Sequence, residues 1–76
     1  MITEKTQNLI KVRALLKTFR TLWEEQNEKK ANHTAKLYEI ATQIVTMKLA
    51  DEFFVSNLSE EDQTLLKDKV YVLIHL

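Results

Sequence analysis

The chain contains neither glycine nor proline among its 76 residues. Glycine supplies the positive φ angles of tight hairpins and phosphate-binding loops, and proline pre-sets the geometry of many turns. A sheet built on short hairpins therefore needs residues that this chain lacks. Asn, Asp, Ser and Lys have to make the turns, which suits a helical chain with few connections. We accordingly predict an all-α fold.

The length predicts one helical domain over residues 1–76, with a small hydrophobic core. The chain has no cysteine, which excludes disulfides and thiolate metal sites. Stability must then come from helix packing, from oligomerisation or from both.

The first predicted helix covers residues 3–28, with Thr3 as a candidate N-cap. Its apolar side chains fall at a and d positions of a heptad, which is typical of a helix that packs along its full length. These are Ile2, Leu9, Val12, Leu16, Phe19 and Trp23, and Leu15 and Leu22 widen the stripe.

Residues 26–34, QNEKKANHT, form the most polar segment and predict a turn. Asn27 or Asn32 can supply the capping conformation there, because asparagine tolerates left-handed geometry and also caps helix N-termini. We expect His33 to be an exposed loop residue. One continuous helix through this segment is the alternative, and it would need a partner chain because of its unusual length.

The second predicted helix covers residues 33–56 and contains the most apolar interior run. Its first half has a single polar arc, formed by Glu39, Thr42, Gln43 and Thr46. The pattern inverts after Met47, so the helix either breaks near Lys48 or continues straight and meets different neighbours on opposite faces. We favour the straight helix, because no helix breaker is present. The candidate helix–helix or dimer interface consists of Lys48, Leu49, Asp51, Phe53 and Phe54.

The third predicted helix covers residues 59–75. Ser59 and Asp62 resemble a capping box, and three acids occupy the first turn. Its last residues are nearly all apolar, which predicts a buried end. We expect a three-helix bundle or a helical hairpin plus a C-terminal helix, with the second helix in the middle. The small core and the two-faced second helix further predict a homodimer.

Charge is unevenly distributed along a chain whose formal net charge is zero. Five bases and one acid precede Glu24, whereas ten acids and six bases follow from Glu24 onward. Arg13, Lys17 and Arg20 form one ridge on the first helix, with Lys11 further round. This basic ridge is the candidate face for a protein or nucleic-acid partner. A dipolar chain of this kind can also neutralise itself by folding one helix against another.

The residues required by most catalytic templates are missing. Without glycine the chain has neither a P-loop nor a dinucleotide fingerprint, and His33 and His75 lack metal-ligand partners one helical turn away. The acids Glu60 and Glu61 are better explained by the helix dipole than by a divalent cation. We therefore predict no catalytic residues, no metal and no cofactor.

We interpret the chain as a non-enzymatic protein-interaction module: a regulator, inhibitor or adaptor, such as a phage- or plasmid-type accessory protein. A nucleic-acid-binding regulator that uses the basic ridge is one alternative, although the pI of about 6.7 is not strongly basic. An immunity or antitoxin protein is another. We expect a cytoplasmic protein with no signal peptide, no membrane association and no small-molecule substrate.

Overall fold

The computed structural model describes residues 4–47 and 56–75. Within these ranges the chain forms three helices and has no β-strand, which confirms the all-α prediction for this part of the chain. α1 spans Glu4–Asn27 and α2 spans Thr34–Thr46. The third helix consists of three consecutive segments, which are α4 (Glu60–Leu65), the π-helical η1 (Leu66–Val70) and α5 (Tyr71–Ile74).

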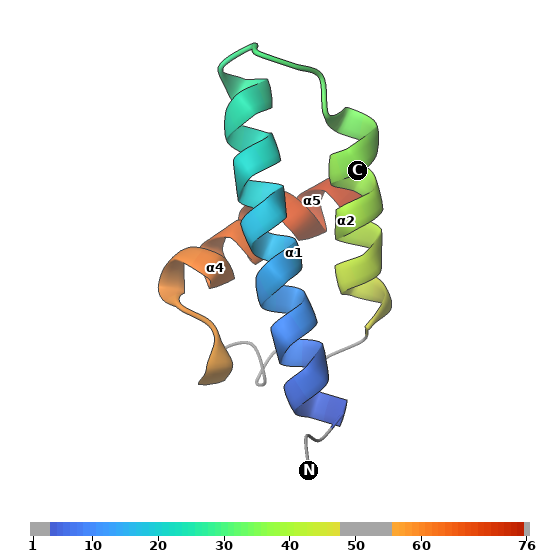
Figure 1. Cartoon of the computed structure of the whole chain (residues 1–76), viewed down its shortest axis with the longest axis vertical. Coiled ribbons are helices and arrows are strands. Elements are labelled where there is room, and N and C mark those ends of the chain that lie inside the picture. Colours follow the sequence, from blue (N-terminus) through green and yellow to red (C-terminus); the bar gives the residue numbers. More distant parts are fainter. Residues whose placement is uncertain (1–3, 48–55, 76) are drawn as a thin grey trace.

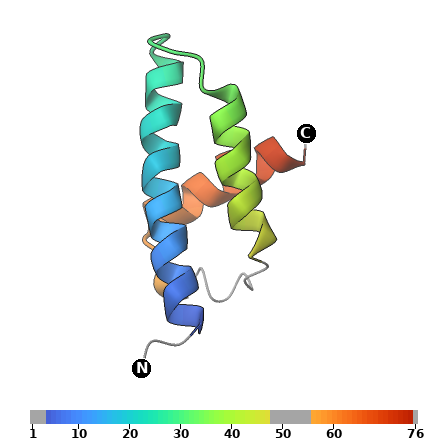
Figure 2. The same cartoon turned by 45° about the vertical axis from the view of Figure 1, so that its right-hand side comes forward.

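α1 and α2 lie side by side and run in opposite directions, and the third helix crosses behind both of them (Figures 1 and 2). Its first segment, α4, contacts α1, and its last segment, α5, contacts α2. α1 and α2 also contact each other, so each helix contacts the other two, and the expected order with the second helix in the middle stays a prediction. A helix that crosses a hairpin buries its apolar side chains against both partners.

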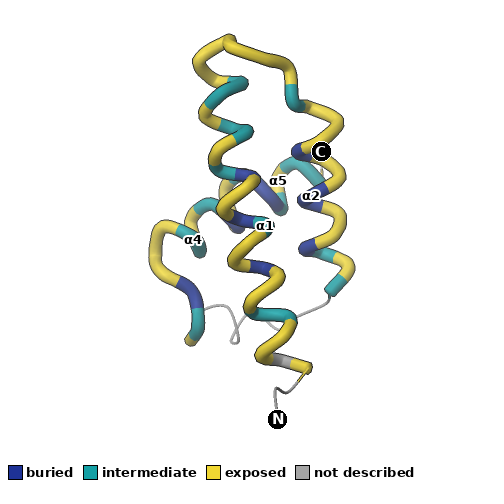
Figure 3. The backbone as a smooth tube through the Cα atoms, in the orientation of Figure 1, coloured by how far each residue is buried: buried dark blue, intermediate teal, exposed yellow. Residues whose placement is uncertain are grey.

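The core lies where the three helices meet (Figure 3). Val12, Leu16 and Phe19 of α1 have no exposed surface, as their heptad positions predict. Each such burial contributes about 1.5–3 kcal/mol relative to exposure. The polar arc predicted on the second helix faces solvent. The remaining buried residues are Leu37, Ile40, Ala41 and Ile44 of α2, together with Leu58, Leu66 and Val70.

The predicted break between the first two helices is confirmed, and its geometry is that of a Schellman motif. The Lys29 amide donates to the Gln26 carbonyl and the Lys30 amide donates to the Glu25 carbonyl, both at 3.0 Å. Lys29 adopts the left-handed conformation, with a φ angle of 61°. Glycine usually occupies this position, and because the chain has none a lysine carries the strain.

The N-terminus of α2 is tied back to the end of α1. The His33 amide donates to Gln26 Oε1 at 2.6 Å, and His33 Nε2 lies 3.4 Å from Glu25 Oε2. The His33 side chain is 22% exposed, so the expectation of an exposed loop residue is wrong. Asn32 has a local capping role, because its Oδ1 accepts from the Thr34 amide at 3.0 Å.

α2 ends at Thr46 rather than at residue 56, which contradicts the prediction of a straight helix through Lys48. The Met47 amide donates to the Ile44 carbonyl at 3.2 Å, a tightened turn of the kind that ends many helices. The candidate interface residues Lys48, Leu49, Asp51, Phe53 and Phe54 lie outside the described residues.

The third helix begins as the sequence predicts. Ser59 Oγ accepts from the Asp62 amide at 3.2 Å, and α4 starts at Glu60. The C-terminal end is helical, but it is not fully buried: Val72 is 48% exposed. The π turn in η1 was not predicted. It is closed by the Tyr71 amide, which donates to the Leu66 carbonyl five residues earlier.

Substituting Lys29→Gly should raise the free energy of unfolding by about 0.5–1 kcal/mol, because glycine adopts positive φ without steric cost. Lys30→Gly is the matched control. It removes the same charge, but Lys30 is not among the described residues with positive φ. It should lower stability. Urea unfolding of both variants checks this prediction. Equal destabilisation by the two glycines would contradict it.

Candidate functional site

The basic ridge of α1 lies against the start of the third helix. Arg20 Nη2 donates to Asp62 Oδ1 at 2.8 Å, and Arg20 Nη1 lies 3.9 Å from Glu61 Oε2. Arg13 Nη2 donates to the Asn57 carbonyl at 2.9 Å. The ridge and the acidic turn therefore contact each other.

Local sequence explains why these groups meet. Arg13 and Arg20 are seven residues apart, so they project from the same side of α1. Ser59 caps α4 and fixes the first helical turn, which orients the Asp62 carboxylate toward α1. The planar guanidinium of Arg20 presents several donors and can reach two carboxylates at once. Lysine in its place would lose this fork.

The ridge is consequently only partly free. The side chains of Lys11 and Lys17 are exposed, and neither forms an ion pair with another described residue. The two arginines, by contrast, donate hydrogen bonds: Arg20 to the third helix and Arg13 to the segment before it. The ridge thus retains two lysines without ion-pair partners among the described residues.

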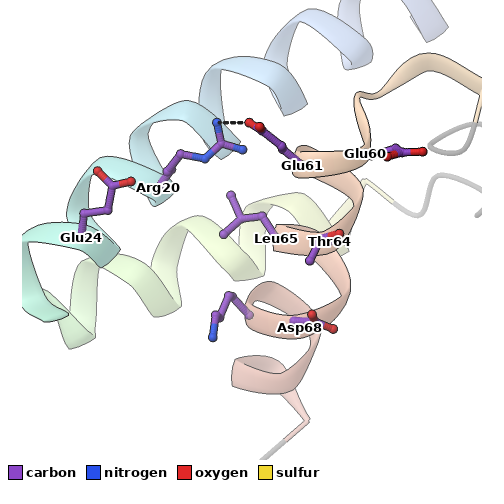
Figure 4. A pocket seen from close by; sticks show the side chains of 8 residues that line it. Arg20, Glu24, Glu60, Glu61, Thr64, Leu65 and Asp68 are labelled. Atoms are coloured by element: carbon purple, nitrogen blue, oxygen red, sulfur yellow. Dashed lines mark ion pairs between the residues drawn. The ribbon is translucent and has the colours of Figure 1, made fainter.

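An open groove with a volume of about 560 Å³ lies between α1 and the third helix (Figure 4). Leu65 projects toward α1 from α4, whereas the Glu60 and Asp68 side chains point away from α1. Four acids and two cations line the groove, so its formal charge is −2. The lining residues are Arg20, Glu24, Glu60, Glu61, Thr64, Leu65, Asp68 and Lys69.

An aromatic pair lies beside this groove. The Phe19 and Trp23 rings are stacked, with their centroids 6.2 Å apart and an interplanar angle of 10°. The Lys69 ammonium lies over the Trp23 ring, 4.9 Å from its centroid, which is within the range of a cation–π interaction. Lys69 therefore belongs both to the groove lining and to this stack.

The other predicted candidates lie apart from the groove or form part of its rim. His75 is exposed and caps the end of α5, and Glu60 is an exposed first-turn acid. Among residues 4–47 and 56–75, no group of three His, Cys, Asp or Glu side chains has metal-binding geometry.

Sequence reasoning missed the groove as a whole. It identified the three acids in the first turn of the third helix and the excess of acids from Glu24 onward. It did not detect that Lys69 would lie over Trp23. The two residues are far apart in the chain and share no local pattern, so only the crossing of the helices brings them together.

The Arg20–Asp62 contact should contribute a coupling energy of about 0.5–1 kcal/mol, because it is short, charge-assisted and partly shielded from solvent. A double-mutant cycle of Arg20→Met and Asp62→Asn, followed by urea unfolding, measures it. The exposed Lys36–Glu39 pair, at 3.8 Å, provides the control. Its cycle of Lys36→Met and Glu39→Gln should give about 0.3 kcal/mol or less. Equal coupling in the two pairs would refute a special role for Arg20.

None of the helices in the described part of the chain is long and apolar enough to cross a membrane. The sequence matches no protein-family model, no curated protein and no solved structure.

Proposed function

We propose that the protein is a non-enzymatic interaction module that binds a basic segment of a partner protein in the groove between α1 and the third helix. The observation that supports this proposal is the composition of the groove: the apolar side chain of Leu65 lines it together with more acids than cations. Glu24 contributes from α1, and Glu60 and Asp68 contribute from the third helix.

This arrangement suits a cationic amphipathic segment. An apolar side chain of the partner would contact Leu65, while its lysines or arginines would meet the surrounding carboxylates. Because Glu24, Glu60 and Asp68 are exposed, their charges would mainly increase the association rate and its dependence on salt. The apolar contact with Leu65 would supply most of the binding free energy and slow dissociation.

The same charge disfavours nucleic acid at this groove, because phosphates would be repelled. Nucleic-acid binding would have to use Lys11 and Lys17, and few phosphate contacts give weak, strongly salt-dependent affinity. This alternative is therefore an outcome of the binding test. An inhibitor, immunity protein or antitoxin that neutralises a basic partner would use the groove in the proposed way.

The double variant Glu24→Gln and Asp68→Asn should weaken binding of a basic peptide about three- to tenfold, because it removes both excess negative charges of the groove. The probe is a synthetic amphipathic peptide of lysine, leucine and alanine, titrated by calorimetry at low salt. The matched control is Glu28→Gln with Glu39→Gln, which removes two carboxylates that do not line the groove.

Three outcomes are informative. Loss of affinity in the groove variant alone supports the proposal. Equal loss in both double variants refutes the groove as the site. Binding of labelled duplex DNA, without binding of the peptide, establishes the nucleic-acid alternative instead.

We also propose that the three helices act as one bundle that assembles as a homodimer. Tyr38 on α2 is 53% exposed and Val72 on α5 is 48% exposed, and a second copy would cover apolar side chains of this kind. Sedimentation at several protein concentrations should show a dimer that dissociates on dilution. A monomer at every concentration would refute this proposal.

A further inference from the structure

The ring of Trp23 already holds a cation. The Lys69 ammonium lies 4.9 Å from the ring centroid, and the same lysine lines the groove beside Asp68. On the α1 side, Glu24 follows Trp23 directly and also lines the groove. The face of an aromatic ring is a general recognition site for lysine and arginine side chains. Here the chain's own lysine occupies it.

We infer that Lys69 is an internal substitute for the partner's cation, and that a lysine or arginine of the bound segment displaces it from the Trp23 ring. This inference rests on the proposed function, because it specifies how the groove recognises its basic partner. Lys69 then sets both affinity and specificity. Lys69 competes for the Trp23 ring, so segments with little positive charge do not displace it. A lysine or arginine next to an apolar residue of the partner does displace it, because the apolar contact adds to the binding free energy.

The geometry permits this exchange. Lys69 is half-buried rather than enclosed, and its ammonium forms no ion pair with a described residue, so leaving the ring breaks no salt bridge among these residues. A lysine stem is flexible and its ammonium is strongly hydrated, so the released side chain can extend into water. Lys69 also lies within η1, and single π turns recur at functional sites in helices.

Lys69→Met tests the exchange, because methionine keeps an apolar stem and removes the competing cation. The same lysine, leucine and alanine peptide should bind this variant about three- to fivefold more tightly than it binds the unmodified protein. Lys67→Met is the matched control. Lys67 is exposed on the same helix and does not line the groove, and its loss should change affinity by less than about 1.5-fold.

A second comparison separates the aromatic site from simple charge removal. Lys69→Met is repeated in a Trp23→Leu background, with Trp23→Phe as a milder variant if leucine destabilises the fold. The gain in affinity should disappear with leucine and be reduced with phenylalanine, because displacement from the ring no longer matters. Lys69→Arg should leave affinity at or below that of the unmodified protein, since arginine also occupies the ring face.

The outcomes distinguish the two levels of the proposal. If the peptide binds and Lys69→Met gives the same gain with and without Trp23, the exchange is refuted while the groove stands. If Lys69→Met gives no gain over Lys67→Met, the exchange is likewise refuted. If neither the unmodified protein nor Lys69→Met binds the peptide, the proposed function fails and the exchange fails with it.

Discussion

Leu66 and Val70 of the third helix are buried against the hairpin of α1 and α2, and the rest of the structure depends on this contact. Two antiparallel helices cannot enclose a core by themselves, because each buries only one stripe of side chains. The crossing helix covers the opening between them. Phe19 and Ile44, from different helices, are both removed from solvent in the resulting cluster. In a chain without cysteine, and hence without disulfides, this shared burial is the main source of stability.

The charged contacts determine where the crossing helix lies rather than whether it binds. Arg13 and Arg20 contact the segment that begins the third helix, and this fixes the register of α4 along α1. Glu24, Glu60 and Asp68 do not pair with Arg20, and they line the groove. The same packing of the third helix on α1 therefore pairs Arg20 with two acids and leaves the other acids exposed in the groove. The opposite charges of the two chain segments make both possible.

Local patterns in the sequence were sufficient for much of the fold. The heptad stripe located α1 to within one residue at each end, and the polar segment 26–34 located the turn. The Ser59 cap followed from residue types alone, because capping is a contact between near neighbours in the chain.

The rest depended on contacts that no local pattern encodes. The Arg20–Asp62 bond joins residues 42 positions apart, and the crossing of the third helix has the same long-range origin. The end of α2 was missed because helix propensity is a weak guide where tertiary packing decides. The left-handed conformation of Lys29 was missed for a related reason. Asparagine was the expected left-handed residue, but the backbone hydrogen bonds of the Schellman motif determine which position is left-handed, whatever side chain it carries.

The π turn of η1 has a consequence for how this small chain can vary. A single π turn amounts to one extra residue accommodated within a helix, and it rotates the side chains of all later residues about the helix axis. α4 contacts α1 and α5 contacts α2, and the π turn between them sets the rotation of one segment relative to the other about the helix axis. Each end of the third helix thus has its own partner. Substitutions that remodel the packing of α5 on α2 therefore need not disturb the groove beside α4. The chain thus separates packing that it can vary from the surface that forms the groove.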